Sequence, residues 1–377
     1  MEKCPEISIV LPCLNEEQAI GFCLDKIKEV VGKNNLNTEI IVVDNGSTDN
    51  SCNIVKEKQV KLIEEKERGY GSACLKGFEV AKGKYIFMAD SDGSYDFDEI
   101  PNFINYLRQG YDFVIGDRFK GEIEKEAMSW FHKYIGNPML SGVLRFFFNA
   151  KIHDVHCGMR AIRKDLLKQL NLRTTGMEFA SEMIIKAIKN NLKIKEISIN
   201  YHKRKGESKL KSLADGWRHL RFMLLYSPLF LFFLPGIFLF LIGLISLIWM
   251  YFGSPEILGI KLYNYPMFLS ALLIIIGYQL IIFALFAKTY AVFHLGDRPA
   301  FERIYRYVTI EKASISGVII TLLGAIIYIT IFLKWLNAGF GALQEFKNSI
   351  IALTLIVIGI QTIFSSFILS ILGIKEK

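Results

Sequence analysis

Apolar and polar positions follow two different patterns along the chain, with the change near Tyr226. Before it, strand-like apolar runs at 7–11, 39–43, 60–64, 85–89 and 113–116 alternate with segments of helical periodicity near 16–31, 50–57, 71–82 and 97–108. Strands that alternate with helices typically form a mostly parallel sheet covered on both faces, so this half is predicted to be an α/β domain. Such sheets bind ligands beyond the carboxyl ends of their strands.

The second half is dominated by four apolar stretches, at about 228–252, 265–293, 315–336 and 348–374. Each reaches the roughly 20 residues that cross a ~30 Å hydrocarbon core. Any one of them could be a buried core helix, but four in succession favour a membrane domain. We therefore expect a globular domain at 1–208, an amphipathic interface helix at 209–227 and a transmembrane domain at 228–377 with a second interface helix near 297–310.

Charge and cysteine content place this architecture in the cell. Basic residues are concentrated before the first span and between the second and third spans, which puts both termini and the globular domain in the cytoplasm of a multi-pass cell-membrane protein. The chain leads from Met1 straight into a strand, so no signal peptide is visible. The net charge of +8 lies mainly beside the spans and fits an anionic membrane face, not a nucleic acid. The six cysteines form no Cys-x-x-Cys pair and are expected to be free, mostly buried thiols.

Two acids one residue apart follow the fourth predicted strand, at Asp90 and Asp92. Residues i and i+2 of a strand face the same way, so both carboxylates can meet one cation. Mg²⁺ and Mn²⁺ prefer oxygen ligands and usually complete their coordination with substrate phosphate. This spacing suggests a metal-bound nucleotide diphosphate, although a polar turn after a buried strand is the simpler reading of an isolated pair.

Three further polar segments follow predicted strands. Asn15 is positioned to cap the next helix, and Asp44, at the end of the second strand, is placed to accept a hydrogen bond from a nucleobase. Arg68 precedes Gly69 and Gly71, whose missing side chains permit close backbone approach, and offers a partner for phosphate or base. All of these fall at one predicted edge of the sheet.

In this order the segments resemble the inverting family 2 glycosyltransferases of GT-A fold, an α/β Rossmann-like domain. The matching segments are Pro12-x-x-Asn15-Glu16, Val43-Asp44-Asn45-Gly46-Ser47-Thr48-Asp49, Arg68-Gly69-x-Gly71 and Asp90-Ser91-Asp92. The resemblance implies that the nucleotide sugar is bound by Pro12, Leu14, Glu16, Val43, Asp44, Arg68, Asp90 and Ser91. It also implies a metal site at Asp92 and Asp90, with Ser94 where the family often has a metal-assisting Gln.

Segments in the second half of the globular domain narrow the resemblance. Gly116-Asp117-Arg118, Asp154-Val-His-Cys-Gly158-Met-Arg160, Gly176-Met-Glu178-Phe-x-x-Glu182 and Gly206-Glu-Ser208-Lys209 resemble the polyprenyl-phosphate hexosyltransferases, the dolichol-phosphate-mannose and undecaprenyl-phosphate-glucose synthase group. Some archaeal members carry four membrane helices after the catalytic domain. One departure is Lys203, with Arg204 next to it, where an Arg is common three residues before the glycine.

This resemblance implies inverting transfer of one hexose from UDP- or GDP-hexose to a polyprenyl (dolichyl-type) phosphate, giving a polyprenyl-phosphate sugar for glycosylation, with Mg²⁺ or Mn²⁺ as cofactor. The implied catalytic residues are Asp90, Asp92 and Arg118. The residues implied to bind the acceptor phosphate are Arg118, Lys203, Arg204, Ser208 and Lys209. A lipid phosphate is already a nucleophilic oxyanion and needs cations more than a base. The donor base, the sugar, the isoprenoid length and assembly into a homo-oligomer stay open.

Two other functions are compatible with parts of this sequence. A processive or hydroxyl-directed membrane glycosyltransferase is one, but its usual Gln/Arg-x-x-Arg-Trp motif is not matched by Asp215-Gly-Trp217-Arg218. A non-catalytic lipid-carrier translocase or scaffold is the other, and the donor motifs argue against it. Glu178 and Glu182 share a face of a predicted helix, where an acid could contact sugar hydroxyls, although Glu178 is as well placed to cap that helix or face solvent.

Overall fold

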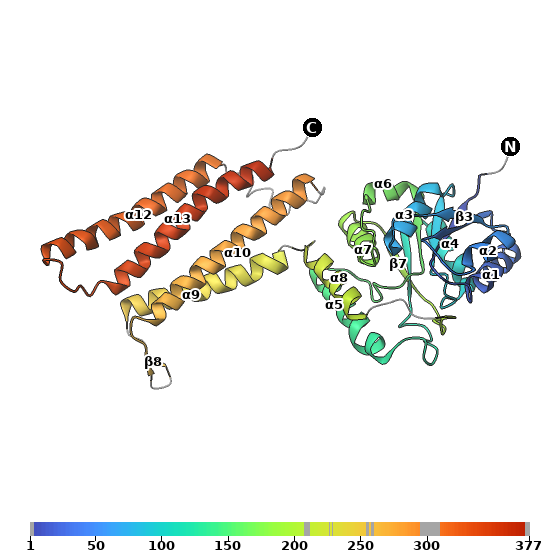
Figure 1. Ribbon diagram of the computed structural model, residues 1–377, viewed down its shortest axis with the longest axis horizontal. Coiled ribbons are helices and arrows are strands. Elements are labelled where there is room, and N and C mark those ends of the chain that lie inside the picture. The colour runs from blue at the N-terminus through green and yellow to red at the C-terminus, as the bar shows by residue number, and fades with distance from the viewer. Residues whose placement is uncertain are drawn as a thin grey trace. The chain divides into compact units, whose positions relative to one another are not determined.

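The structure is a computed structural model that describes residues 4–206, 212–225, 227, 229–253, 256–257, 260–294 and 310–373. The chain divides into two compact units, Met1–Met223 and Leu224–Lys377. The first is built around a sheet and the second from long helices (Figure 1). Each unit is described by itself below.

The first unit contains a mixed seven-stranded sheet in the order β3-β2-β1-β4-β6-β5-β7, counted over the described residues. Its strands are β1 Ile7–Cys13, β2 Thr38–Asp44, β3 Lys61–Glu64, β4 Tyr85–Met88, β5 Phe113–Asp117, β6 Arg160–Arg163 and β7 Ile194–Ser198. β6 runs antiparallel to both of its neighbours, and the other pairs are parallel. The chain moves outward from β1 to β3 and then returns to β4, so the carboxyl ends of β1 and β4 flank the point where the strand order reverses.

Helices cover this sheet and begin within one residue of the predicted positions at Ser51, Tyr70 and Phe97, whereas the first helix begins at Ile20 and not near 16. The helical elements of the first unit are α1 Ile20–Lys33, α2 Ser51–Glu57, α3 Tyr70–Val80, η1 Phe97–Glu99, α4 Ile100–Arg108, η2 His132–Gly136, α5 Asn137–Phe148, η3 Lys164–Leu166, α6 Leu167–Leu170 and α7 Phe179–Lys189, and α8 Ser212–Leu225 runs across the boundary to the second unit. β1, β4 and β5 are buried along their whole length, as expected for strands covered on both faces. α3 packs on β1 and β2, and α4 packs on β4, β5 and β6. These strands and helices form the core that positions the site.

The second unit contains four apolar helices long enough to cross a membrane, which confirms the prediction of four apolar membrane-length helices. Its elements are η4 Leu229–Phe233, α9 Leu234–Phe252, a short β8–β9 hairpin of Glu256–Ile257 and Ile260–Lys261, α10 Pro266–His294, α12 Ile310–Asn337 and α13 Phe346–Leu372. α9 packs against α10, and α12 against α13 (Figure 1). Glycines permit these contacts, because a Cβ at Gly277 would lie 2.4 Å from the Phe240 nitrogen.

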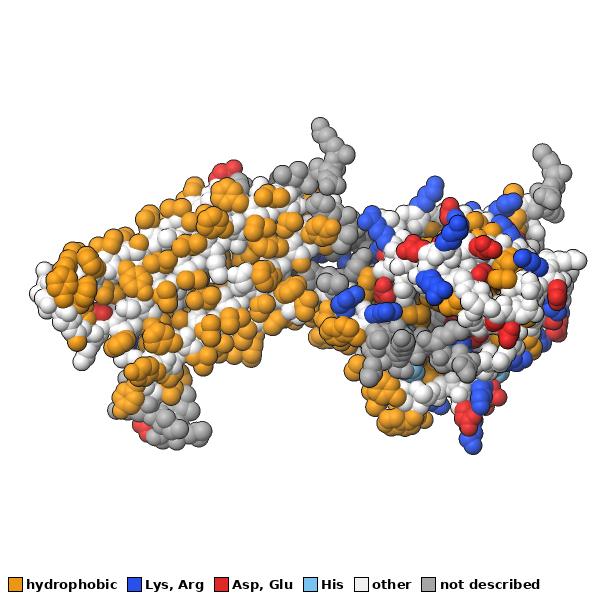
Figure 2. Space-filling view, viewed as in Figure 1, with side chains coloured by type: hydrophobic (Ala, Val, Ile, Leu, Met, Phe, Trp, Pro, Cys, Tyr) orange, Lys and Arg blue, Asp and Glu red, His pale blue; other side chains and the backbone are white. Residues whose placement is uncertain are grey.

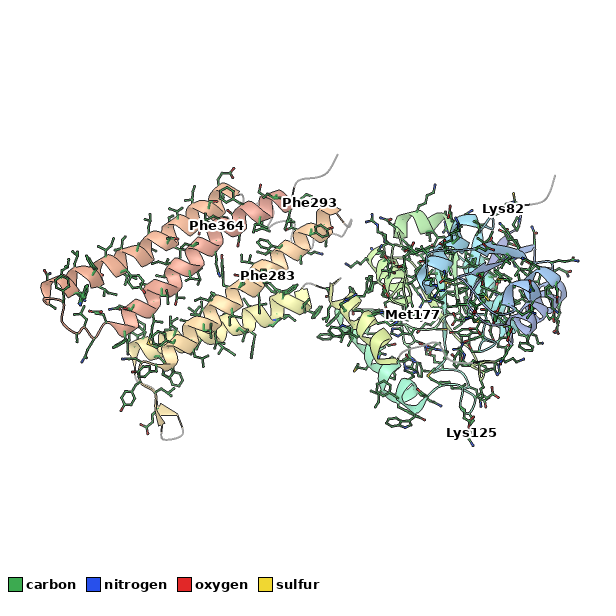
Figure 3. All side chains as sticks on the ribbon, viewed as in Figure 1. Lys82, Lys125, Met177, Phe283, Phe293 and Phe364 are labelled. Atoms are coloured by element: carbon green, nitrogen blue, oxygen red, sulfur yellow. The ribbon has the colours of Figure 1, made fainter. Side chains whose placement is uncertain are left out.

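Apolar side chains cover the outside of these four helices. In Figure 2 hydrophobic side chains fill most of the visible face of the helical unit, whereas Lys, Arg, Asp and Glu gather on the sheet-containing unit. Phe283 of α10 and Phe364 of α13, both labelled in Figure 3, are exposed aromatic residues of this surface. Such a surface is typical of helices solvated by lipid.

Of the two interface helices predicted from the sequence, one lies in a described part of the chain. The interval 209–227 contains a helix, α8, over Ser212–Leu225. The helix expected near 297–310 falls almost entirely outside the described residues, which resume at Ile310 with α12.

Candidate active site

The polar segments predicted from the sequence meet at the carboxyl ends of β1, β2 and β4. Pro12 and Cys13 of β1 lie in register with Val43 and Asp44 of β2. The Ser91 hydroxyl donates to the Pro12 carbonyl at 2.7 Å, which fastens the segment after β4 to the end of β1. Ser91 is itself buried, so its contact holds the neighbouring acids in place.

The carboxylates of Asp90 and Asp92 interact, but not because the two residues share one face of a strand, as the sequence suggested. β4 ends at Met88, so both acids lie in the turn after the strand and not on it. Tyr70 of α3 donates its hydroxyl to Asp90 Oδ1 at 3.0 Å. Burial and the charge of Asp92 raise the pKa of Asp90 to about 6. Two negative groups are therefore held close together in a poorly hydrated place, where a cation is stabilised.

The turn itself orients Asp92, which is 8% exposed. Its Oδ1 accepts from the Ser94 backbone N–H at 3.0 Å and from the Ser94 hydroxyl at 2.5 Å. Its Oδ2 faces Arg204, whose Nη2 lies 3.6 Å away. Ser94, which the resemblance placed near the metal, is fully buried and acts here on Asp92.

The geometry suits a hard divalent cation. The described residues contain no group of three or more His, Cys, Asp and Glu side chains that could hold a metal. The protein would therefore supply Asp92 and Asp90, and diphosphate and water the other oxygen ligands, as is usual for Mg²⁺. Gly158 provides the room, because a Cβ there would lie 2.6 Å from Asp90 Oδ2. These residues fit Mg²⁺ or Mn²⁺.

Glu16 faces the same space from the turn after β1. Its backbone N–H donates to the Ser51 hydroxyl of α2 at 2.8 Å, and its Oε1 lies 3.2 Å from Arg204 Nη2. Asn15 does not cap α1, because that helix begins at Ile20 and Asn15 has a left-handed φ of 50°. Its side chain instead accepts from the Thr48 N–H at 2.7 Å, which joins the turns after β1 and β2.

The turn after β2 is organised by Asp44 and Asn45. Asp44 accepts backbone hydrogen bonds from Gly46 and Ser47, so its carboxylate is already engaged by its own turn. The Val43 side chain points toward α3, where a Cβ at Gly77 would meet it at 3.2 Å, so only its backbone borders the site. Leu14 is half-buried in the turn after β1.

Asn45 has a structural role that was not predicted from the sequence, where it is only one member of the segment 43–49. Its amide donates to the carbonyls of Glu65 and Glu67 and accepts from the Gly69 N–H at 2.7 Å. It thereby holds the segment that carries Arg68, an exposed side chain that lies over Gly46. The sequence signal for this role is an asparagine directly after a buried strand, because a buried side-chain amide needs hydrogen-bond partners.

Gly69 and Gly71 permit a close backbone approach, but to the protein's own chain. A Cβ at Gly69 would lie 2.1 Å from the Thr175 carbonyl oxygen, and one at Gly71 would lie 2.2 Å from that of Thr174. Glu182 of α7 holds this partner segment, since its carboxylate accepts from the backbone N–H groups of Arg173 and Thr174 and from the Thr174 hydroxyl.

Glu182 is thus structural and not a sugar contact. It is fully buried and pairs with Lys186 at 2.7 Å. Burial alone would raise the pKa of Glu182, but the hydrogen bonds from Lys186 and Thr174 outweigh it and hold this pKa below its ordinary value. Glu178 precedes α7 and is half-buried.

Arg118 is committed to a buried ion pair. Its Nε and Nη2 donate to the two oxygens of Asp154 at 2.7 and 2.9 Å, and the guanidinium stacks 5.2 Å above the Tyr201 ring. Arg118 is 6% exposed and Asp154 is fully buried. The two N–H groups that could hold a phosphate side by side, at Nε and Nη2, already donate to Asp154. This geometry therefore does not support the predicted roles of Arg118 in catalysis and acceptor binding.

Of the basic residues predicted before Gly206 to bind the acceptor phosphate, one lies beside the acids of the site. Arg204 faces Glu16 and Asp92, whereas the Lys203 ammonium pairs with Glu126 at 2.6 Å and is exposed. Arg204 and not Lys203 therefore carries the positive charge that faces the acids. Ser208 and Lys209, also expected to bind phosphate, lie outside the described residues.

The cysteines are free, as expected: Cys4 is exposed, Cys52 is half-buried, and Cys13, Cys23, Cys74 and Cys157 are buried. Burial raises the pKa of the Cys13, Cys23 and Cys157 thiols to about 12 and that of Cys52 to about 11.

Buried acids at the switch point of an α/β sheet, together with four apolar helices long enough to cross a membrane, are typical of membrane-bound nucleotide-sugar enzymes. Residues 8–170 match the family model "Glycosyl transferase family 2", and residues 285–373 match "Glycosyltransferase family 2 C-terminal transmembrane region". The chain belongs to the family 2 glycosyltransferases with a C-terminal transmembrane region, and it is a hexosyltransferase and a multi-pass membrane protein.

Relatives of known name match either nearly the whole chain or its first half. The low-salt glycan biosynthesis hexosyltransferase Agl6 of Haloferax volcanii is 37% identical over 98% of this chain and 89% of its own length. The dolichyl-phosphate hexose transferase of the same organism is 32% identical over 56% of this chain and 89% of its own. Mycobacterium tuberculosis glucosyl-3-phosphoglycerate synthase, solved with Mn²⁺, UDP and glucosyl-3-phosphoglycerate, aligns with a TM-score of 0.48 and 20% identity over 59% of this chain and 80% of its own.

Proposed function

We propose that this enzyme transfers a single hexose from a nucleoside-diphosphate sugar to a membrane polyprenyl phosphate, with inversion at the anomeric carbon. The observation that carries the proposal is the convergence of Asp90, Asp92 and Glu16 with the guanidinium of Arg204 at one site. Acids that suit a metal diphosphate thereby meet a cation that suits a second phosphate. The relatives named for dolichyl-phosphate hexose transfer and for glycan biosynthesis support it.

The donor would bind along the carboxyl ends of β1, β2 and β4. Pro12, Asp44 and Arg68 border the space for the base and ribose, and Asp90 and Asp92 the space for the diphosphate. A bound Mg²⁺ or Mn²⁺ would neutralise the leaving diphosphate. The base would then lie beside the turn after β2, where Asp44 accepts hydrogen bonds from the backbone of Gly46 and Ser47.

The acceptor phosphate needs positive charge and no general base, because it is anionic at neutral pH. Arg204 is a cation that pairs with Glu16 and Asp92, and its planar fork suits a phosphate. Lys205 follows with its ammonium 3.2 Å from the Phe22 ring centroid, at the rim of the same turn. The chain thus offers attraction and orientation to the nucleophile, and the metal-bound diphosphate offers a good leaving group.

Apolar surface on the first unit supports a site held at the bilayer. Trp130 is 67% exposed and Phe146 is 69% exposed, and further exposed apolar residues of this segment are Phe131, Tyr134, Ile135 and Met139. Trp217 of α8 is exposed as well. An exposed apolar patch with aromatic side chains is typical of an interfacial surface. We propose that these residues contact lipid on the cytoplasmic side, where the positive-inside rule predicts both termini.

The test is incubation of the purified enzyme with short polyprenyl phosphates, a panel of labelled UDP- and GDP-hexoses, and Mg²⁺ or Mn²⁺. We expect an acid-labile glycolipid and free nucleoside diphosphate, both abolished by EDTA and by Asp92→Ala. Asp98→Ala is the matched control, because Asp98 is an exposed acid in η1, away from the turn that carries Asp92. Transfer to a sugar hydroxyl but never to a lipid phosphate would refute the proposal, as would full biological activity of Asp92→Ala.

A further inference from the structure

One guanidinium bridges two acids of the site. Arg204 Nη2 lies 3.2 Å from Glu16 Oε1 and 3.6 Å from Asp92 Oδ2, and each acid is only 8% exposed. Among the described residues, Arg204 Nε is buried without a hydrogen-bond partner. The side chain is thus held through Nη2, by a hydrogen bond to Glu16 and by charge at Asp92, and leaves Nε unused, which is an incomplete arrangement for a purely structural arginine.

The two oxygens of Asp92 are not equivalent. The hydrogen bonds that this carboxylate accepts from described residues, the Ser94 N–H and hydroxyl, go to Oδ1. Oδ2 is the oxygen that faces Arg204. A divalent cation bound to Asp92 would take the oxygen that the turn leaves open, so it would meet Arg204 there, and two like charges repel each other in a site with little water.

The backbone on either side of Arg204 is tied to the same turn. His202 N–H donates to the Ser94 carbonyl and Lys205 N–H donates to the Asp92 carbonyl, each at 2.8 Å. The Lys205 stem also lies against Gly93, 3.6 Å from the position of a Cβ there. Because main-chain bonds hold both flanks, the part of this segment that is able to move independently is the Arg204 side chain.

We propose that Arg204 and the donor's divalent cation exchange places on Asp92 Oδ2, so that the guanidinium turns to the acceptor phosphate only once the metal-bound donor is in the site. This inference rests on the proposed function and adds an order of binding to it. Arg204 offsets part of the negative charge of Glu16 and Asp92 before the donor binds, and the divalent cation would offset more of it once bound. The released fork, with Nε included, then has the donors to grip a phosphate bidentately.

The first experiment measures Mn²⁺ binding to the full-length protein in detergent by electron paramagnetic resonance, without nucleotide. We expect Arg204→Gln to bind Mn²⁺ at least about fivefold tighter than the wild type, the scale of a typical coupling between sites. Lys203→Gln removes the same charge one residue away, where it pairs with exposed Glu126, and should leave the affinity within about twofold. Equal or weaker Mn²⁺ binding by Arg204→Gln would overturn the proposal.

A second arm measures farnesyl phosphate binding by calorimetry, with and without Mn²⁺ and UDP or GDP. Mn²⁺ with nucleotide should strengthen binding to the wild type at least about fivefold, and Arg204→Gln should lose that gain. Equal affinities in the wild type would refute the release step. If Arg204→Gln does not fold, Arg204→Lys keeps the charge without the fork and should bind Mn²⁺ with intermediate affinity, and wild-type affinity would then count against the exchange. Failure of hexose transfer alongside a positive Mn²⁺ result would refute the proposed function alone.

Discussion

The backbone of Gly158 approaches Asp90 so closely that a β-carbon at position 158 would lie 2.6 Å from Oδ2 of the carboxylate. Gly158→Ala should therefore displace Asp90 and lower kcat/KM by roughly 100-fold, the scale of a 1 Å misplacement, while the protein still folds. Gly142→Ala in α5 is the control, because a Cβ there meets Arg145 Nη2 at 3.9 Å and nothing nearer. Steady-state kinetics and thermal unfolding of both variants decide between local and global damage, and normal activity of Gly158→Ala would contradict the expectation.

Gly71 should matter for stability more than for nucleotide affinity. An alanine there would place a Cβ 2.2 Å from the Thr174 carbonyl oxygen, and overpacking of this kind costs about 1–3 kcal/mol. Gly32→Ala in α1 has open space around the new methyl group and should be neutral or slightly stabilising. The measurement is the unfolding midpoint in detergent. A Gly71→Ala protein with an unchanged midpoint and weakened donor binding would instead assign this glycine to the nucleotide.

Glu182 should stabilise the first unit in a pH-dependent way. Its folded pKa is held below the ordinary value, so its contribution is present above about pH 4.3, the unfolded value, and is lost as the pH falls through the folded value. Glu182→Gln should lower the unfolding midpoint most at neutral pH, and the gap from the wild type should shrink below about pH 4. Glu79→Gln, at an exposed pair with Lys76, should change little. A gap that stays constant with pH would contradict the role given to Glu182.

Arg118 and Asp154 should act as a unit. Removing one partner strands the other charge in a buried place, which typically costs about 3–5 kcal/mol, so Arg118→Gln and Asp154→Asn should each lower stability and activity together. The double variant should be less damaged than the sum of the two single changes. Thermal unfolding and activity are measured on all three proteins. If Arg118→Gln loses activity but keeps the unfolding midpoint of the wild type, this arginine would bind the acceptor phosphate after all.

The exposed aromatic surface should serve the lipid acceptor and not the chemical step. Changing Trp130 and Phe146 together to Ser should raise the KM for a long-chain polyprenyl phosphate in liposomes and leave the rate with a water-soluble short-chain acceptor unchanged. Lys125→Ser, a polar change at an exposed position of the same unit (Figure 3), is the comparison. Equal loss with both acceptors would indicate that the aromatic residues support the fold.

The order of elements and the place of the site could be predicted because hydrophobic periodicity and polar strand ends are local properties. β1, β2 and β4 begin at or within one residue of the predicted positions, and Asp90, Asp92 and Glu16 do meet at their carboxyl ends. The family was likewise readable from these segments, and the comparisons confirm it.

The partners of each side chain could not be predicted, because they depend on segments far apart in the sequence. Nothing in the local pattern shows that Asp154 occupies the fork of Arg118, that Thr174 lies against Gly71, or that Arg204 and not Lys203 turns inward. Burial in a folded core decides these choices, and a polar residue that looks available in a motif is often already satisfied.

The distribution of thiols has a practical consequence for experiments on the intact protein. Cys4 is the exposed cysteine, whereas the raised pKa values of Cys13, Cys23, Cys52 and Cys157 keep those sulfurs protonated and slow to alkylate. A membrane-impermeant maleimide should therefore attach a fluorophore near the amino terminus without mutagenesis. Applied to sealed vesicles of known orientation, the same reagent reads which face of the bilayer that terminus occupies.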